Sequence, residues 1–158
     1  MVPKNPEQVQ KERDNFAALY EGLKAPFPKE ALSTDSSRGF ALTSIKAQYV
    51  TERLNEVCGV DGWSFTGEYK EVSGEGGVLF FGVLTINDGF KGHQQEAVGF
   101  SAQKRNVGDA YKGAKTDALS KAASLFGLGN EVFKGNVAPP GATKKKASSK
   151  PRAVSNDF

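Results

Sequence analysis

The sequence predicts an α+β fold: a β-β-β-α core in which helices pack on an antiparallel meander. Three strand-like segments joined by short turns lie in the middle of the chain, which favours antiparallel pairing. Helical patterns lie on both sides of them, two before and one after. We therefore assign residues 1–136 to one domain. Residues 137–158, where Pro, Gly, Ser, Lys and Ala predominate, are expected to be a disordered Lys-rich tail.

The first predicted helix covers residues 7–21. Pro6 suits its first turn, apolar residues follow at helical spacing, and Gly22 is the expected stop. Residues 29–40 are polar and are predicted to form a loop. A short strand is predicted over residues 40–43.

The second predicted helix covers residues 45–58, with Ser44 as its N-cap and Gly59 at its end. The later elements are strands over residues 63–72, 78–86 and 94–103 and a third helix over residues 108–126. The middle strand is apolar on both faces, so both faces need cover. A loop, the first helix or a neighbouring copy of the chain is expected to cover the second face.

Composition and charge exclude several classes of protein. With one cysteine, Cys58, and one histidine, His93, an internal disulfide, a thiolate metal cluster and a His–His metal site are excluded. The sequence has no apolar stretch of membrane-spanning length and no apolar leader, so we expect a soluble cytoplasmic protein without a membrane partner. The net charge is −4 over residues 1–100, +3 over 101–136 and +4 over 137–158. The folded part therefore turns basic in its last third.

The segments that could serve an enzyme lack the required patterns. Residues 108–116 resemble a nucleotide phosphate loop, but one residue too many separates Gly113 from Lys115. His93 has no nucleophile near it in the sequence and is expected to be an exposed turn residue. Cys58 lies on the apolar side of its helix, where a buried structural thiol is expected. The sequence therefore predicts a protein that is not an enzyme and needs no cofactor or metal.

Basic and aromatic residues alternate on the second helix. Lys46, Tyr49 and Arg53 lie at i, i+3 and i+7, which places them on one helix face. A ring between two cations is a possible stacking platform for a nucleobase, with phosphate contacts on either side. In the alternative interpretation, Glu52 and Glu56 pair with these cations and Tyr49 packs at the edge of the core.

The third helix carries a stronger basic pattern. Its apolar arc is expected to centre on Tyr111, Ala114, Ala118, Ala122, Leu125 and Phe126. Lys112 and Lys121 border this arc, Lys115 lies inside it, and Lys104 and Arg105 precede the helix. Five cations around one helix predict a groove that follows a phosphate backbone. A solvated helix surface is the alternative that spacing alone leaves open.

Several segments together resemble one family. Residues 43–63 contain the pattern Asn-Glu-x-x-Gly-x-x-Gly-Trp, which resembles the helix-to-strand signature of the Rad52 superfamily of single-strand annealing proteins. Residues 97–100 are similar to its third-strand motif, and residues 110–127 to its long DNA-groove helix. Gly-Asn at residues 129–130 matches the pair that follows this helix. The resemblance covers about residues 16–135.

The resemblance implies a β-β-β-α core, ring-shaped homo-oligomers and a positively charged groove around the ring that holds single-stranded DNA, without a cofactor. Some members bind single-stranded DNA, notably 3′ ends, and shield it from nucleases during double-strand break repair. Annealing members carry more groove arginine than this chain, which has Ser120, Lys121 and Ser124 at the corresponding helix positions and Tyr49 in place of an Arg. We therefore expect binding and protection more than annealing.

The resulting hypothesis is a nucleoid-associated protein whose residues 1–136 form a single-strand annealing-type DNA-binding domain. Its expected DNA contacts are Lys112, Lys121, Lys104, Arg105, Lys115, Tyr49, Lys46 and Arg53. The tail is expected to add salt-sensitive attraction or to hold a repair-protein partner. Two alternatives stay open. One is a double-stranded RNA or DNA-binding module, which shares the α-β-β-β-α order, and the other is an assembly protein that touches nucleic acid only through its tail.

Overall fold

The computed structural model describes residues 2–37, 39–74 and 76–135. Its elements are α1 (Pro6–Leu23), a 3-10 turn η1 (Lys29–Ala31), β1 (Leu32–Asp35), β2 (Leu42–Ile45), α2 (Ala47–Cys58), β3 (Trp63–Glu71), β4 (Gly77–Asn87), β5 (Gly92–Ala102), α3 (Val107–Leu125) and α4 (Asn130–Phe133). The α+β fold with a β-β-β-α core is confirmed. The tail predicted over residues 137–158 lies outside the described residues.

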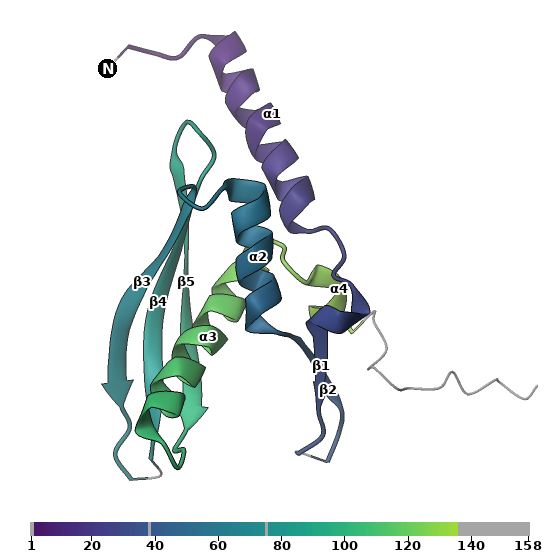
Figure 1. Cartoon of the computed structure of the whole chain (residues 1–158). Coiled ribbons are helices and arrows are strands. Elements are labelled where there is room, and N and C mark those ends of the chain that lie inside the picture. The colour runs from purple at the N-terminus through teal and green to yellow at the C-terminus, as the bar shows by residue number, and fades with distance from the viewer. Residues whose placement is uncertain (1, 38, 75, 136–158) are drawn as a thin grey trace, which may run out of the picture.

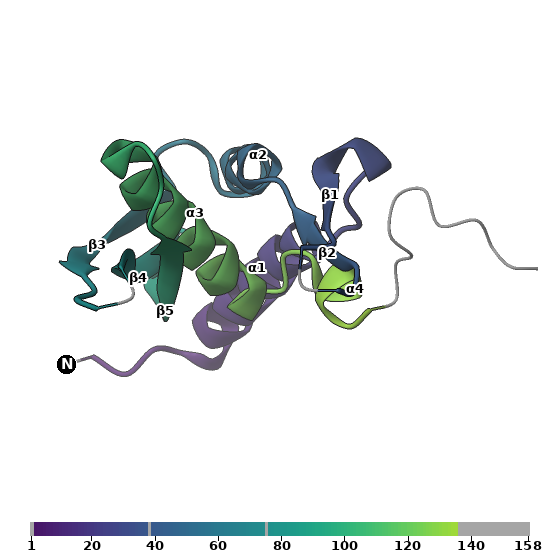
Figure 2. The same cartoon turned by 90° about the horizontal axis from the view of Figure 1, so that it is seen from below.

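The central unit is the antiparallel sheet β3-β4-β5 with α3 lying across one face (Figures 1 and 2). Close contact between helix and sheet depends on Gly99 of β5. A Cβ atom at this position would lie 2.0 Å from the carbonyl oxygen of Ala114 and 2.3 Å from the backbone nitrogen of Ala118. Glycine in the strand and alanines on the helix therefore allow the two backbones to approach each other.

Helix α3 joins two parts of the hydrophobic core. Its first half packs on the sheet in a small cluster that includes Val78, Phe80 and Ala114. Its second half enters a larger cluster, together with side chains of α2, the end of α1 and the far end of β4, such as Leu54 and Ile86. The N-terminal part of α1 extends beyond this core (Figure 1). Among the described residues, we find no helix with the length and apolar character that crossing a membrane requires.

The second face of the sheet is uncovered in this chain. Phe81 of β4 and Val98 and Phe100 of β5 lie on the face away from α3, and their exposed fractions are 46%, 45% and 48%. The first helix does not cover them, because α1 packs against α2 and beside His93 on the other face. The alternative in which α1 provides this cover is therefore wrong.

A short hairpin occupies much of the segment that was expected to be a loop. Strand β1 pairs with β2 in the register Leu32↔Ile45, and the two strands project as a separate hairpin beside the sheet-and-α3 body (Figure 1). Ser44, expected to be an N-cap, lies in β2, where its hydroxyl is 3.0 Å from that of Ser33. Lys46 is the N-cap residue of α2 instead.

Two further expectations about helix residues are wrong. Gly22 lies within α1, which ends one residue later and is followed by Lys24 as its C-cap. Leu125, placed at the centre of the apolar arc of α3, is 58% exposed. The buried side instead includes Leu119 and Ala123, because the second half of the helix turns its packed face from the sheet toward α2.

Candidate nucleic-acid interface

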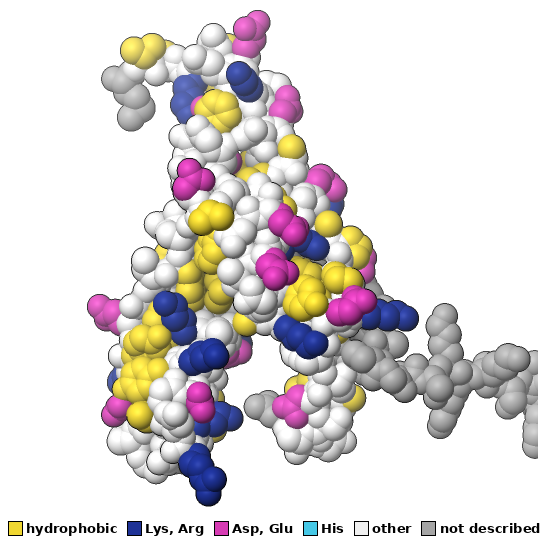
Figure 3. Space-filling model, viewed as in Figure 1, with side chains coloured by type: hydrophobic (Ala, Val, Ile, Leu, Met, Phe, Trp, Pro, Cys, Tyr) yellow, Lys and Arg dark blue, Asp and Glu magenta, His cyan; other side chains and the backbone are white. Residues whose placement is uncertain are grey.

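A groove runs between α3 and the base of the β1–β2 hairpin, and α4 closes one side of it. It has a volume of about 300 Å³. The residues that line it are Ser44, Ile45, Ala47, Gly113, Thr116, Asp117, Ser120, Lys121 and Phe133. Figure 3 shows the open gap between the hairpin and the sheet-and-α3 body, with Lys and Arg side chains gathered on the lower part of that body.

The wall that α3 contributes to the groove consists mainly of small residues. Gly113, Thr116 and Ser120 share this side of the helix, so the backbone of a ligand can approach closely. At about 100° per residue, Lys112 lies roughly 80° to one side of this wall and Lys121 roughly 100° to the other. Lys121 therefore lines the groove, and Lys112, which is not among the lining residues, lies on the other side of the same helix wall.

The basic residues at the start of α3 have free charges. Lys104, Arg105 and Lys112 are exposed, and none of them forms a hydrogen bond or ion pair with another described residue. Lys115 lies farther round the helix, outside the groove, with its ammonium 5.9 Å from the centre of the Phe80 ring. Unpaired surface cations of this kind can neutralise phosphates without first losing a protein partner.

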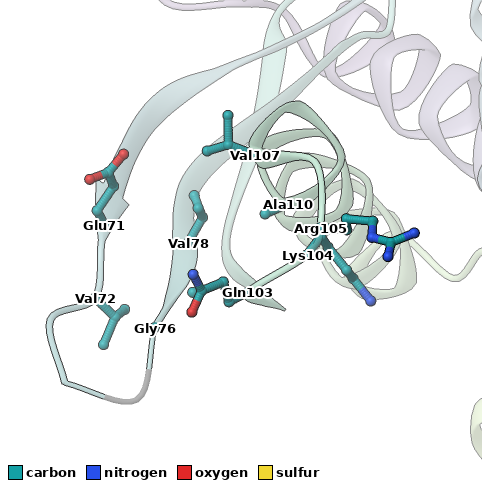
Figure 4. A pocket seen from close by; sticks show the side chains of 10 residues that line it. Glu71, Val72, Gly76, Val78, Gln103, Lys104, Arg105, Val107 and Ala110 are labelled. Carbon is teal, nitrogen blue, oxygen red and sulfur yellow. The ribbon is translucent and has the colours of Figure 1, made fainter.

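Lys104 and Arg105 also flank a second cavity, between the end of the sheet and the start of α3. This cavity has a volume of about 360 Å³. Figure 4 shows both side chains pointing away from Glu71 and Val72 on the opposite side of the cavity. The two cations therefore extend the basic surface of α3, and their charged groups point away from the cavity.

Lys121 differs from the other cations because its ammonium group already has partners within the protein. Its Nζ lies 2.8 Å from Oδ2 of Asp117 and donates to the carbonyl oxygen of Val98 at 3.4 Å. The same Asp117 oxygen accepts a hydrogen bond from the backbone N–H of Phe100 at 2.9 Å. A phosphate at Lys121 therefore competes with Asp117.

Arg53 serves the fold. Its guanidinium donates to the carbonyl oxygens of Leu23 at 3.2 Å, Ala25 at 2.6 Å and Pro26 at 3.2 Å, and lies 4.1 Å from the centre of the Phe27 ring. Burial lowers the pKa of Arg53, but an arginine stays charged at neutral pH. Because its donors are used on the segment after α1, Arg53 is removed from the candidate interface.

The stacking platform expected on α2 is not formed. Tyr49 is half-buried and packs against the main core cluster. Lys46 donates from Nζ to the carbonyl oxygen of Glu30 at 2.8 Å, although its side chain stays exposed beside the groove. Lys46 and Arg53 both hold the connection between α1 and the hairpin. Helical spacing correctly indicated that these residues share a face of α2. It could not indicate that the segment after α1 packs there, because that segment has no periodic pattern.

His93 and Cys58 have contacts that fit a role in the fold. His93 was expected in an exposed turn, but it lies half-buried in β5, with Nε2 2.7 Å from Oδ2 of the buried Asp88 and its ring against Phe16. Cys58 is half-buried, and burial raises the pKa of its thiol to about 11, which disfavours the reactive thiolate. The described residues include no group of three or more His, Cys, Asp or Glu placed to hold a metal ion.

Phe133 lines the groove but was not among the expected DNA contacts. The segment after α3 has no periodic pattern, but it forms the short helix α4, which places this phenylalanine on the groove. An aromatic residue three positions after Asn130 of the Gly-Asn pair was the available signal.

The β-β-β-α core and the sequence motifs place this chain in a class of double-strand break repair proteins. The chain belongs to the Rad52/22 family of double-strand break repair proteins, whose family model matches residues 15–150. The resemblance inferred from the sequence motifs is thereby confirmed.

Two curated relatives are similar to this chain. They are the single-stranded DNA-binding protein DdrA of Deinococcus radiodurans, 32% identical over 118 residues, and DdrA of Deinococcus deserti, 35% identical over 118 residues. Each match covers 70% of this chain, but 52% and 54% of the respective relative. The chain thus spans about half the length of the curated relatives it matches.

Proposed function

We propose that this protein binds single-stranded DNA along the groove of α3 and shields it from nucleases during double-strand break repair. The observation that carries the proposal is the free ammonium of Lys112 beside a helix wall of small residues. The names of the two relatives and of the family support the same ligand and the same process. The function needs no catalysis and no cofactor, and it places the protein on chromosomal DNA in the cytoplasm.

The groove suits an unpaired strand better than a duplex. Gly113, Thr116 and Ser120 leave room for one sugar-phosphate backbone, which Lys112 and Lys121 reach from either side. Lys104 and Arg105 extend the positive surface beyond the start of the helix. In a duplex the bases are paired and stacked inside, so only the phosphates of its outer surface could reach this groove.

Copies of the chain close into a ring through the uncovered sheet face. Phe81, Val98 and Phe100 form an apolar surface whose exposure is costly for a monomer. A neighbouring copy that covers this surface would bring the grooves of successive subunits into line. A strand held across several subunits gains affinity, because each further contact is intramolecular.

Protection is favoured over annealing for an electrostatic reason. Asp117 pairs with Lys121, and Ser120 and Ser124 are neutral, so this part of α3 has little free positive charge. Annealing requires a strand that is held firmly with its bases available for pairing. Weaker groove charge is sufficient to cover a strand and exclude a nuclease.

A comparison of binding at several salt concentrations tests the proposal. The full chain, a chain without residues 137–158 and the Lys112→Ala variant are titrated with a single strand and with a duplex of equal length. We expect the single strand to bind tighter than the duplex, the truncated chain to retain binding, and Lys112→Ala to weaken it and flatten the salt dependence.

Two results would contradict the proposal. Tighter binding of the duplex would favour a double-strand-binding module, and complete loss of binding on removal of the tail would favour an assembly protein that touches DNA through its tail alone. The preferred end is tested by nuclease digestion of duplexes that carry a 3′ or a 5′ overhang. We expect this protein to protect the 3′ overhang more.

A further inference from the structure

Phe133 is an exposed aromatic residue on the side of the groove opposite the small-residue wall of α3. Its exposed fraction is 53%. The preceding residue, Val132, packs against the main core cluster, and successive helical residues point about 100° apart. Burial of Val132 therefore directs Phe133 outward. Its ring lies beside Gly129, which has the left-handed φ of +72° at the start of α4.

The groove between Phe133 and α3 has the shape and chemistry of a site for a flat aromatic ligand. One side offers the side chain of Phe133, while the other offers Gly113, Thr116 and Ser120, whose side chains are small. The Ser120 hydroxyl has no hydrogen-bond partner among the described residues, so it is free to bind a polar edge. The volume of about 300 Å³ is at the lower end of the range for small-molecule sites.

Charge around the groove identifies the kind of ligand. Lys121 lines the groove and the exposed Lys112 precedes Gly113 of its wall, so an aromatic group attached to a phosphate fits better than an uncharged one. A nucleobase of an unpaired strand has a free face for stacking, polar groups on its edge and a phosphate on either side. In a duplex both faces of the base are already stacked on neighbours, which makes the site selective for single strands.

We propose that Phe133 is the stacking platform for one unpaired base of the bound strand, with the edge of that base at Ser120. The inference rests on the proposed function, because it assumes that the strand follows the groove. It adds the feature that distinguishes an unpaired strand from a duplex. Base stacking on an aromatic side chain contributes ~1–3 kcal/mol per base.

The test compares bases with phosphates. Wild type, Phe133→Ala and Phe133→Leu are titrated with a thymidine oligonucleotide and with an abasic strand of equal length. The matched control is Phe90→Ala, because Phe90 is 46% exposed and lies in the β4–β5 turn. We expect Phe133→Ala to bind the thymidine strand roughly 5- to 150-fold more weakly, Phe133→Leu to lose less, and the control to match wild type.

The abasic strand and the unfolding curve complete the test. Affinity for the abasic strand and the slope of log K against log salt should be unchanged in Phe133→Ala, because no phosphate contact is lost. Urea midpoints show whether the variants fold, and Phe133→Leu keeps most of the apolar volume if the alanine variant does not. Equal losses on both strands, or no loss on either, would overturn the stacking proposal.

Other occupants of the site give different results. If residues 136–158 cover Phe133, the substitution has no effect until they are removed; if a second copy covers it, the substitution changes the oligomer mass without DNA. Either result overturns the proposal. If wild type binds neither strand, the proposed function itself is wrong. If Lys112→Ala weakens binding but Phe133→Ala does not, the proposed function is retained and base stacking on Phe133 is excluded.

Discussion

Asp117 and Lys121, one turn apart on α3, form an ion pair of 2.8 Å at the outer edge of β5. Asp117 accepts the N–H of Phe100, and Lys121 donates to the carbonyl oxygen of Val98. An edge strand with free backbone groups can pair with strands of other chains. Because these two side chains occupy part of the β5 edge, extension of the sheet at β5 is disfavoured.

Because of this ion pair, Lys121 and Lys112 are expected to contribute differently to DNA binding. Lys112→Ala should reduce the slope of log K against log salt for single-stranded DNA by about 0.7, the value for one phosphate contact. Lys121→Ala should reduce it less, because a phosphate at Lys121 displaces Asp117 first. Fluorescence anisotropy titrations at a series of salt concentrations measure both slopes. Equal reductions would mean that the ion pair opens on binding without cost.

Arg53 is expected to affect stability without affecting DNA binding. Arg53→Lys keeps the charge but loses the planar group that reaches the carbonyl oxygens of Leu23, Ala25 and Pro26, so the free energy of unfolding should fall by ~1.5–3 kcal/mol. Urea unfolding measures the loss. Arg105→Lys is the control, since Arg105 is exposed without a described partner and should keep full stability. Weakened DNA binding by folded Arg53→Lys would return Arg53 to the interface.

Local patterns predict the sheet and α3 to within a few residues. The alternation in β3, the Asn-Asp-Gly turn before β5 and the apolar arc of α3 all lie within one segment of sequence, so no distant partner is needed to recognise them. The strand predicted over residues 40–43 overlaps β2 (Leu42–Ile45), but its partner β1 was missed because each strand has only four residues. Strands of that length form through pairing and packing, and neither is visible as a periodic pattern.

The relative directions of side chains on one helix were predictable from the sequence. Helical geometry alone sets Lys112 and Lys121 on either side of the small-residue wall of α3, and Lys121 lines the groove. The direction of Arg53 was also predictable, but its role depends on the carbonyl groups of a distant irregular segment. Phe133 faces the groove because Val132 enters the core, and this follows from packing across the whole domain.

Gly99 is expected to control the docking of α3 on the sheet. In Gly99→Ala the new Cβ would lie 2.0 Å from the carbonyl oxygen of Ala114, so the helix must move away or the variant unfolds. We expect a loss of ~1–3 kcal/mol or more in the free energy of unfolding, measured with urea. Gly92→Ala in the same strand is the control, because its nearest contact is a Thr85 methyl group at 3.3 Å. Equal stabilities of the two variants would contradict the close approach.

The uncovered sheet face is expected to hold subunits together. Replacement of Phe81 and Phe100 by Ser should lower the mass of the oligomer toward that of a monomer. It should change the free energy of unfolding of the subunit little, because both rings are about half exposed. Light scattering measures the mass with and without single-stranded DNA. Phe90→Ser, at the β4–β5 turn, is the control of similar exposure, and an unchanged mass in the double variant would show that subunits use another surface.

The buried Asp88 makes stability depend on acid pH. Burial alone would raise the pKa of its carboxyl group, but hydrogen bonds from His93 and from the backbone N–H groups of Lys91 and Phe90 outweigh this effect and lower the pKa to about 2. Asp in an unfolded chain has a pKa of about 3.9. The stabilisation is therefore complete above about pH 5 and is lost as the pH falls through 4 toward 2.

Asp88→Asn isolates this contribution, because the amide does not titrate. At pH 7 the variant should be less stable by ~1.5–3 kcal/mol, since hydrogen bonds to a charged acceptor are replaced by weaker ones. The difference from wild type should shrink as the pH falls from 5 to 2, because protonation removes the carboxylate from wild type alone. Urea unfolding at each pH measures it, with the exposed Asp61→Asn as the control. A difference that stays constant down to pH 2 would mean that Asp88 stabilises the β4–β5 turn through its shape and not through its charge.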